Sequence, residues 1–119
     1  MRSFHAAWAW VAVLTTGLVG LWGVGLAVAK RSADRAFRIG WAVAYAAVTV
    51  QVAAGLVMWG RGDRPENEFH VFYGVTIAAT FAFAYVYRAQ MERRPAMSYG
   101  VMLLFVMGLG LRAWSNVTL

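Results

Sequence analysis

The chain of 119 residues contains no cysteine, so it holds neither a disulfide framework nor a thiolate nucleophile or a Cys-ligated metal. Charge is also scarce. Charged residues make up 13% of the chain, about half of the roughly 25% found in soluble domains, and only five of them are acidic. With so few carboxylates, the sequence offers no carboxylate cluster, no pairing of a nucleophile with a base and no phosphate-binding loop.

Apolar residues are abundant instead, at 61% of the chain. Soluble domains contain roughly 45–50%, and a soluble fold of this size leaves too much of its area in water to hide such an excess. Lipid is the solvent that removes this conflict. The net charge is +6, and the basic residues flank the apolar runs, which suits anionic lipid head groups. No basic face typical of nucleic-acid binding is apparent.

The apolar residues fall into four runs, each near the roughly 20 residues needed to cross a hydrocarbon core. Backbone groups in hydrocarbon must pair within their own segment, so each run is expected to be a helix. Short connections favour antiparallel neighbours. The sequence therefore predicts an all-α, integral membrane four-helix up-down bundle that forms a single transmembrane domain over residues 1–119 without a soluble domain. The predicted spans are about 6–29, 39–59, 69–87 and 97–113.

The Lys and Arg residues predict the orientation in the cell membrane. Seven of them lie in or beside the loops 30–38 and 88–96, whereas four lie on the opposite side. Cytoplasmic loops carry an excess of Lys and Arg. We therefore expect a multi-pass protein with these two loops in the cytoplasm and both termini outside.

Small residues recur at helical spacing in three of the runs, and such stripes let helix backbones approach closely in lipid. We expect these stripes to pack within the chain, and the alternative is that they dock onto partner helices. The first run also has Gly17, Gly23 and Gly25 off its stripe, which offers a second face for partner helices. We expect the first two helices to pack through their Gly20 and Gly55 faces. The three stripes are Ala12, Thr16 and Gly20; Gly40, Ala44, Ala47, Gln51 and Gly55; and Gly74, Ala78 and Ala82.

Trp and Tyr lie near the ends of the runs, as in the aromatic belts at membrane interfaces. The outer belt is expected to hold Trp8, Trp10, Trp59, Tyr73 and Trp114, and the inner belt Trp41, Tyr87 and Tyr99. No Asp, Glu or Lys lies inside a predicted span, which argues against autonomous proton-coupled transport because such transporters keep an ionisable group at membrane depth.

Two histidines are the first candidate site. His5 and His70 open the first and third spans, so both should lie on the outer side at similar depth. Two imidazoles that face each other across a bundle could hold a b-type haem through both axial positions. The alternative is that each is an ordinary hydrogen-bonded or solvated histidine without a cofactor.

A polar pocket on the outer side is the second candidate. It would combine Gln51, His70, Tyr73 and Arg112, and it could accept a quinone carbonyl, a lipid phosphate or a partner's carboxylate. The alternatives are that Arg112 snorkels to the interface and that Gln51 forms a structural interhelical hydrogen bond.

The second half of the chain carries a pattern of the form HxFYG, YxYRxQ, YG and GLGxRA, within residues 66–113. This pattern resembles an uncharacterised family of small four-helix integral membrane proteins of actinobacteria. The resemblance implies four spans and draws attention to His70, Tyr73, Arg88 and Arg112. It implies no reaction.

Taken together, the residues favour a small non-enzymatic membrane protein, either an accessory or structural subunit of a larger membrane complex or a self-associating bundle. No catalytic residue and no metal site are expected, and no cofactor is needed. Its partners would be the lipid bilayer and other membrane subunits or itself, not nucleic acid. One alternative is an electron-transfer subunit that binds haem b or quinone near the outer face, and a second is a small oligomeric channel or carrier.

Overall fold

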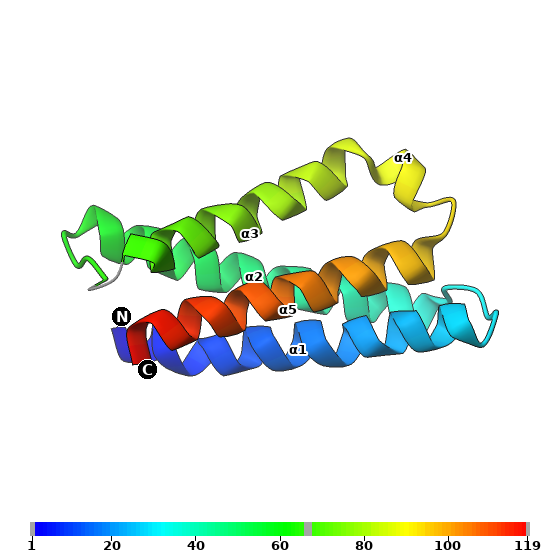
Figure 1. Ribbon diagram of the computed structural model, residues 1–119, viewed down its shortest axis with the longest axis horizontal. Helices are drawn as coiled ribbons and strands as arrows, with labels where there is room; N and C mark the ends of the chain where they lie inside the picture. Colours follow the sequence, from blue (N-terminus) through cyan, green and yellow to red (C-terminus); the bar gives the residue numbers. More distant parts are fainter. Residues whose placement is uncertain (1, 66–67, 119) are drawn as a thin grey trace.

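A computed structural model of the protein describes residues 2–65 and 68–118. Their four long helices are α1 (Arg2–Val28), α2 (Arg35–Gly60), α3 (Glu68–Val86) and α5 (Pro95–Thr118), and the short α4 (Arg88–Met91) follows α3. All four long helices are long and apolar enough to cross a membrane. Each long helix runs antiparallel to the next along the chain, and the four form a bundle (Figure 1). The prediction of an all-α bundle of four spans is confirmed, and the chain is a small four-span helical membrane protein.

Helix α2 extends past its apolar run because a polar residue caps it. The Asp34 carboxylate accepts a hydrogen bond from the Phe37 amide at 2.8 Å, so α2 begins four residues before the predicted span. At the end of α1, Lys30 adopts a left-handed φ of 58°, while Lys30 N and Arg31 N donate to the Ala27 and Leu26 carbonyls. This is the helix-ending hydrogen-bond pattern in which glycine is usual.

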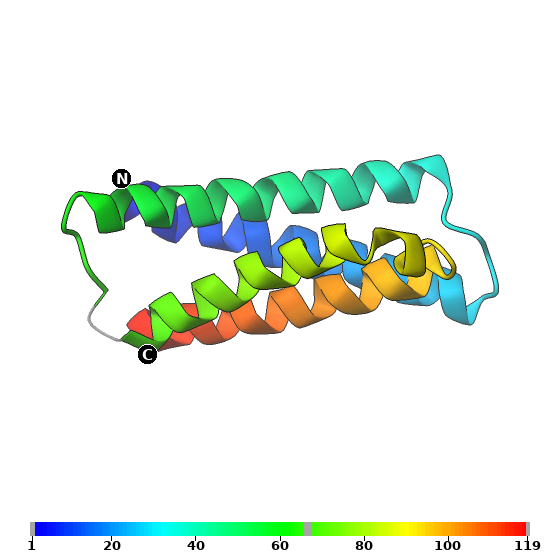
Figure 2. The ribbon, with the colours of Figure 1, turned by 90° about the horizontal axis from the view of Figure 1, so that it is seen from above.

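The order of the helices around the bundle is α2, α1, α5, α3. Helix α1 packs extensively against both α5 and α2, and α3 packs against α5. Although α2 and α3 are connected in sequence, their backbones approach each other at few positions, and Figure 2 shows α3 beside α5. One end of the bundle holds the start of α1, the end of α5 and residues 61–65, and is called the terminal end. The other holds the 29–34 and 87–94 segments and is called the basic end.

The closest packing joins α1 to α5 along a glycine seam formed by Gly17, Gly20, Gly23 and Gly100. A Cβ added to Gly20 would lie 2.9 Å from Leu104 Cγ and 3.0 Å from the Gly100 carbonyl oxygen. The prediction that Gly20 packs against the second helix is therefore wrong, because this face is turned toward α5. Gly17 and Gly23 are buried in the same seam, so they do not form a free second face.

The small-residue stripe of α2 packs inside the chain as expected. Ala44 and Ala47 are buried, and a Cβ on Gly55 would lie 3.3 Å from His5 Cε1 of α1. The stripe of α3 does not follow this rule. Ala78 and Ala82 are exposed and a Cβ on Gly74 would meet nothing within 4 Å, so the expectation that this stripe packs within the chain is wrong.

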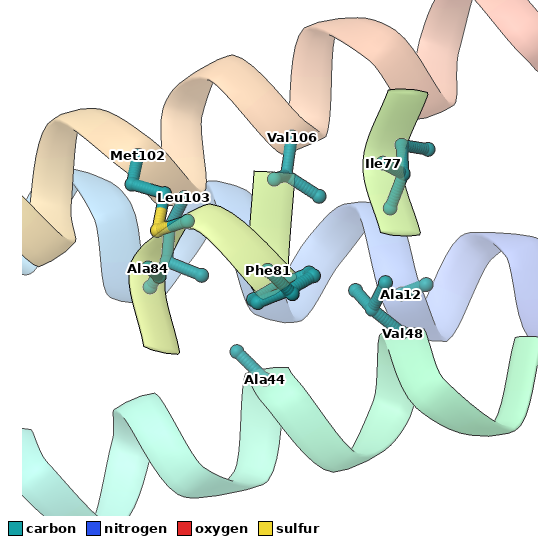
Figure 3. Packing of buried hydrophobic residues seen from close by; sticks show 9 residues of the cluster. All are labelled: Ala12, Ala44, Val48, Ile77, Phe81, Ala84, Met102, Leu103 and Val106. Atoms are coloured by element: carbon teal, nitrogen blue, oxygen red, sulfur yellow. The ribbon is translucent and has the colours of Figure 1, made fainter. Parts of the chain in front are cut away.

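Large side chains hold α3 in place instead. The buried residues of α3 are Ile77, Phe81 and Ala84. The Phe81 side chain points from α3 into the core between α2 and α5 (Figure 3). The core cluster consists of Ala12, Ala44, Val48, Ile77, Phe81, Ala84, Met102, Leu103 and Val106. Aromatic and aliphatic packing, rather than backbone contact, therefore attaches α3 to the bundle.

Three aromatic residues assigned to the interface belts turn inward instead. The Trp8 indole N–H donates to the Ala47 carbonyl oxygen at 2.8 Å, which links α1 to α2. The rings of Trp41 and Tyr99 lie 4.4 Å apart between α2 and α5, and Tyr99 is buried. Buried Trp and Tyr need partners for their polar atoms and add packing area, which explains these interior positions.

Candidate functional site

The five residues singled out from the sequence, His5, Gln51, His70, Tyr73 and Arg112, all lie toward the terminal end. They come from all four long helices, so no single helix forms the site. Antiparallel packing brings the start of α1 and α3 to the same end as the end of α5 (Figure 1). The five residues are called the terminal cluster below.

Gln51 joins α2 to α1 in this cluster. Its side-chain amide donates to the His5 carbonyl oxygen at 2.9 Å, which is the interhelical hydrogen bond expected of a polar residue in a span. Two buried atoms have no hydrogen-bond partner among the described residues, Gln51 Oε1 and His5 Nδ1. A small cavity of about 50 Å³ lies next to Gln51, between α1, α2, α3 and α5, and is also lined by Thr16.

The two histidines meet across the bundle. Their ring centroids are 5.9 Å apart and the ring planes make an angle of 77°. His70 Nδ1 lies 2.8 Å from the Ala113 carbonyl oxygen of α5. A carbonyl oxygen can only accept, so Nδ1 carries the hydrogen and Nε2 of a neutral His70 carries the lone pair. The expected proximity of His5 and His70 is therefore present.

Arg112 contacts Tyr73 on the exposed side of the cluster. Its Nε donates to the Tyr73 hydroxyl oxygen at 3.4 Å, and the Arg112 side chain is exposed. Within the described residues, no hydrogen bond joins Arg112 to His70 or to Gln51. The predicted polar pocket is thus divided into an exposed pair, Tyr73 with Arg112, and an inner group around His5, Gln51 and His70.

A second site lies at the basic end, and the sequence analysis did not identify it. A cavity of about 320 Å³ opens between α2, α3 and the start of α5. This aromatic crevice is lined by Trp41, Ala42, Tyr45, Phe81, Ala84, Tyr85, Arg88 and Tyr99. The signal was present as two aromatic pairs spaced four residues apart, Trp41 with Tyr45 and Phe81 with Tyr85, which lie on one face of each helix.

An ion pair closes the bundle beside the crevice. Arg38 of α2 and Glu92, just after α4, form two parallel hydrogen bonds of 2.8 and 2.9 Å, and the Tyr99 hydroxyl donates to Glu92 at 3.3 Å. The hydrogen bonds from Arg38 hold the pKa of the Glu92 carboxyl below its ordinary value, although partial desolvation opposes this. The contact fixes the α3–α5 connection against α2.

The described ranges contain no group of three His, Asp or Glu side chains placed to hold a metal ion. Comparison of the chain with protein-family models, with curated proteins and with solved structures gives no match.

Proposed function

We propose that this protein is a non-enzymatic accessory membrane protein that associates laterally with another transmembrane chain or with a second copy of itself. The observation that carries the proposal is the exposed stripe of α3. The small-residue stripes of α1 and α2 lie against neighbouring helices of the bundle, whereas Gly74 of α3 faces open space and Ala78 and Ala82 are exposed. Small residues on a lipid-facing stripe allow a partner helix to approach closely.

The position of α3 at the edge of the bundle supports the same function. It packs mainly against α5, and a smaller share of its span is buried than in any other described span. Association through α3 would therefore cover the least enclosed helix. The connections are short, so the surface available to a partner lies mostly along the helices.

The test measures the mass of the complex in mild detergent. We expect the wild type to run as a complex larger than one chain, and Ala78→Ile to reduce it to a single chain because the bulkier side chain blocks helix contact. Ala79→Ile is the matched control, since Ala79 is also exposed but lies off the stripe. A wild-type protein that purifies as a single chain without any partner would refute the proposal.

An electron-transfer subunit is the second candidate, and the His5–His70 pair favours it. The two imidazoles come from α1 and α3, and their ring centroids lie 5.9 Å apart across the bundle. A histidine that donates Nδ1–H to a backbone carbonyl, as His70 does, has the hydrogen bonding typical of a metal-bound histidine. A b-type haem is the cofactor that two such ligands would hold. A quinone would instead use the exposed Tyr73–Arg112 pair.

A visible absorption spectrum of the protein purified from its membrane tests this candidate. A haem protein would show the intense haem bands, and His70→Ala would abolish them, while Arg112→Gln would leave them unchanged. Colourless protein that stays colourless after incubation with haem would exclude the haem-binding function.

A further inference from the structure

The aromatic crevice exists because the backbones of α2 and α3 stay apart, so that only side chains bridge the two helices. Its volume of about 320 Å³ lies within the range of roughly 300–1,000 Å³ found for small-molecule sites. The crevice is open on the side between α2 and α3. An amphiphilic molecule in the membrane could therefore enter laterally, without passing through water.

Its walls are flat and aromatic. The rings of Trp41 and Tyr99 lie 4.4 Å apart, and those of Tyr45 and Phe81 lie 4.7 Å apart in a T-shaped arrangement. The ring centroid of Trp41 also lies 5.9 Å from that of Phe81, so the rings pack against one another. Aromatic walls favour a planar ring over a flexible acyl chain. Offset-stacked and edge-to-face ring pairs contribute more free energy than the buried apolar area alone provides.

The polar groups of the crevice can all donate hydrogen bonds. The Trp41 indole N–H and the Tyr45 hydroxyl make no hydrogen bond within the described part of the chain. Arg88 is the charged lining residue, and it is held in place because it donates to the Tyr85 carbonyl oxygen at 2.7 Å and lies 4.3 Å from the Tyr85 ring centroid. Donors and a cation favour a ligand with acceptor oxygens and disfavour a cationic amphiphile.

We propose that the aromatic crevice binds an amphiphile with a quinone-type head group. The flat ring would stack against the aromatic walls and its carbonyl oxygens would accept hydrogen bonds from Trp41 or Tyr45. Its apolar tail would leave through the opening between α2 and α3. The inference is independent of the proposed association through the α3 stripe, because the lining does not include Gly74, Ala78 or Ala82.

The experiment titrates an alkylated benzoquinone into the protein in nanodiscs of zwitterionic lipid and follows tryptophan fluorescence, which quinones quench. We expect saturable quenching, and Trp41→Phe should remove most of its amplitude although five tryptophans remain. Ala42→Phe places a ring in the crevice and should weaken binding at least tenfold. Ala42 lines the crevice and is exposed, so the new ring would occupy the open space of the crevice without displacing a buried side chain. Ala46→Phe is the matched control, because Ala46 is exposed on α2 outside the crevice.

Tyr45→Phe provides a second variant, since it removes only a hydroxyl and keeps the ring. We expect it to weaken binding severalfold without changing the unfolding temperature. Quenching that rises linearly, or that is equal in Ala42→Phe and Ala46→Phe, would show partition into lipid and overturn the proposal. So would saturable binding of phosphatidylglycerol at the crevice that the quinone fails to displace, because the site would then recognise an anionic lipid.

Discussion

Replacing Gly23 with alanine tests the glycine seam that joins α1 to α5. The new Cβ would lie 2.7 Å from the Ala96 carbonyl oxygen and 2.9 Å from Gly100 Cα. Both atoms belong to the backbone of α5, so no side-chain rotation can make room. Ordinary contact begins at 3.4 Å, and the two helices must therefore separate by about 0.7 Å, the difference between 3.4 and 2.7 Å.

The magnitude follows from that separation. A gap of about 0.5–1 Å removes roughly a quarter to a half of the dispersion attraction between the atoms concerned. Overpacking of this kind costs about 1–3 kcal/mol. Alanine regains about 1 kcal/mol because glycine is a poor helix former. We expect a net loss of up to about 2 kcal/mol in the free energy of unfolding, the cost of overpacking less the gain in helix propensity.

The assay is reversible unfolding in detergent micelles by titration with a denaturing detergent, followed by tryptophan fluorescence. Gly25→Ala is the matched control, because a Cβ at Gly25 meets nothing within 4 Å. This control should be neutral or more stable by up to about 1 kcal/mol. If Gly23→Ala were as stable as Gly25→Ala, the close approach of α1 and α5 would be refuted.

Three further predictions follow from the loops and the basic end. Glu92→Gln removes an exposed ion pair and should cost less than about 1 kcal/mol at neutral pH. The folded pKa of Glu92 is lowered, so this difference should be present above the ordinary pKa of 4.5 and vanish as the pH falls through the lowered value, which denaturation at a series of pH values checks. Lys30→Gly relieves a left-handed residue and should stabilise the fold by up to about 1 kcal/mol in the same assay. An impermeant thiol reagent added outside whole cells should label Ser115→Cys and not Ser32→Cys, and the reverse pattern would invert the predicted topology.

The spans could be predicted from the sequence because hydrocarbon leaves the backbone few choices. An apolar run of about 20 residues must satisfy its own amide groups, and only a helix does so within one segment. The predicted ends differ from the structure by a few residues, since hydropathy reports where lipid ends and not where a cap ends the helix. Asp34 shows this directly, because its carboxylate starts α2 in the polar region.

The helix order could not be predicted in the same way. A stripe such as Ala12, Thr16 and Gly20 shows that one face of the helix carries small side chains and allows close approach. In a membrane every face of a span is apolar, so any neighbouring helix could cover that face. The structure shows which helix covers this face, because Gly20 and Gly23 lie against Gly100 of α5. For the same reason, the stripe of α3 could not be distinguished in advance from one that packs inside the chain.

The terminal cluster was partly predictable. Depth follows from position along the chain, so His5, His70 and Arg112 were expected at one end of the bundle. The rotation of each helix decides which of them touch, and the sequence does not report it. The Arg112 side chain therefore meets Tyr73, whereas His70 meets His5 and the Ala113 carbonyl.

The glycine seam also explains why the bundle has an open edge. Because α5 packs closely on α1, it lies between α1 and α3. Helix α3 therefore packs on α5, and its backbone approaches α2 at few positions. The same arrangement leaves the small-residue stripe of α3 outside and opens the aromatic crevice between α2 and α3. Near the crevice, α2 is held to the α3–α5 connection by the ion pair of Arg38 with Glu92. A change that spreads the seam should therefore alter the crevice as well as the stability, since Tyr99 lines the crevice and is adjacent to Gly100 in the seam.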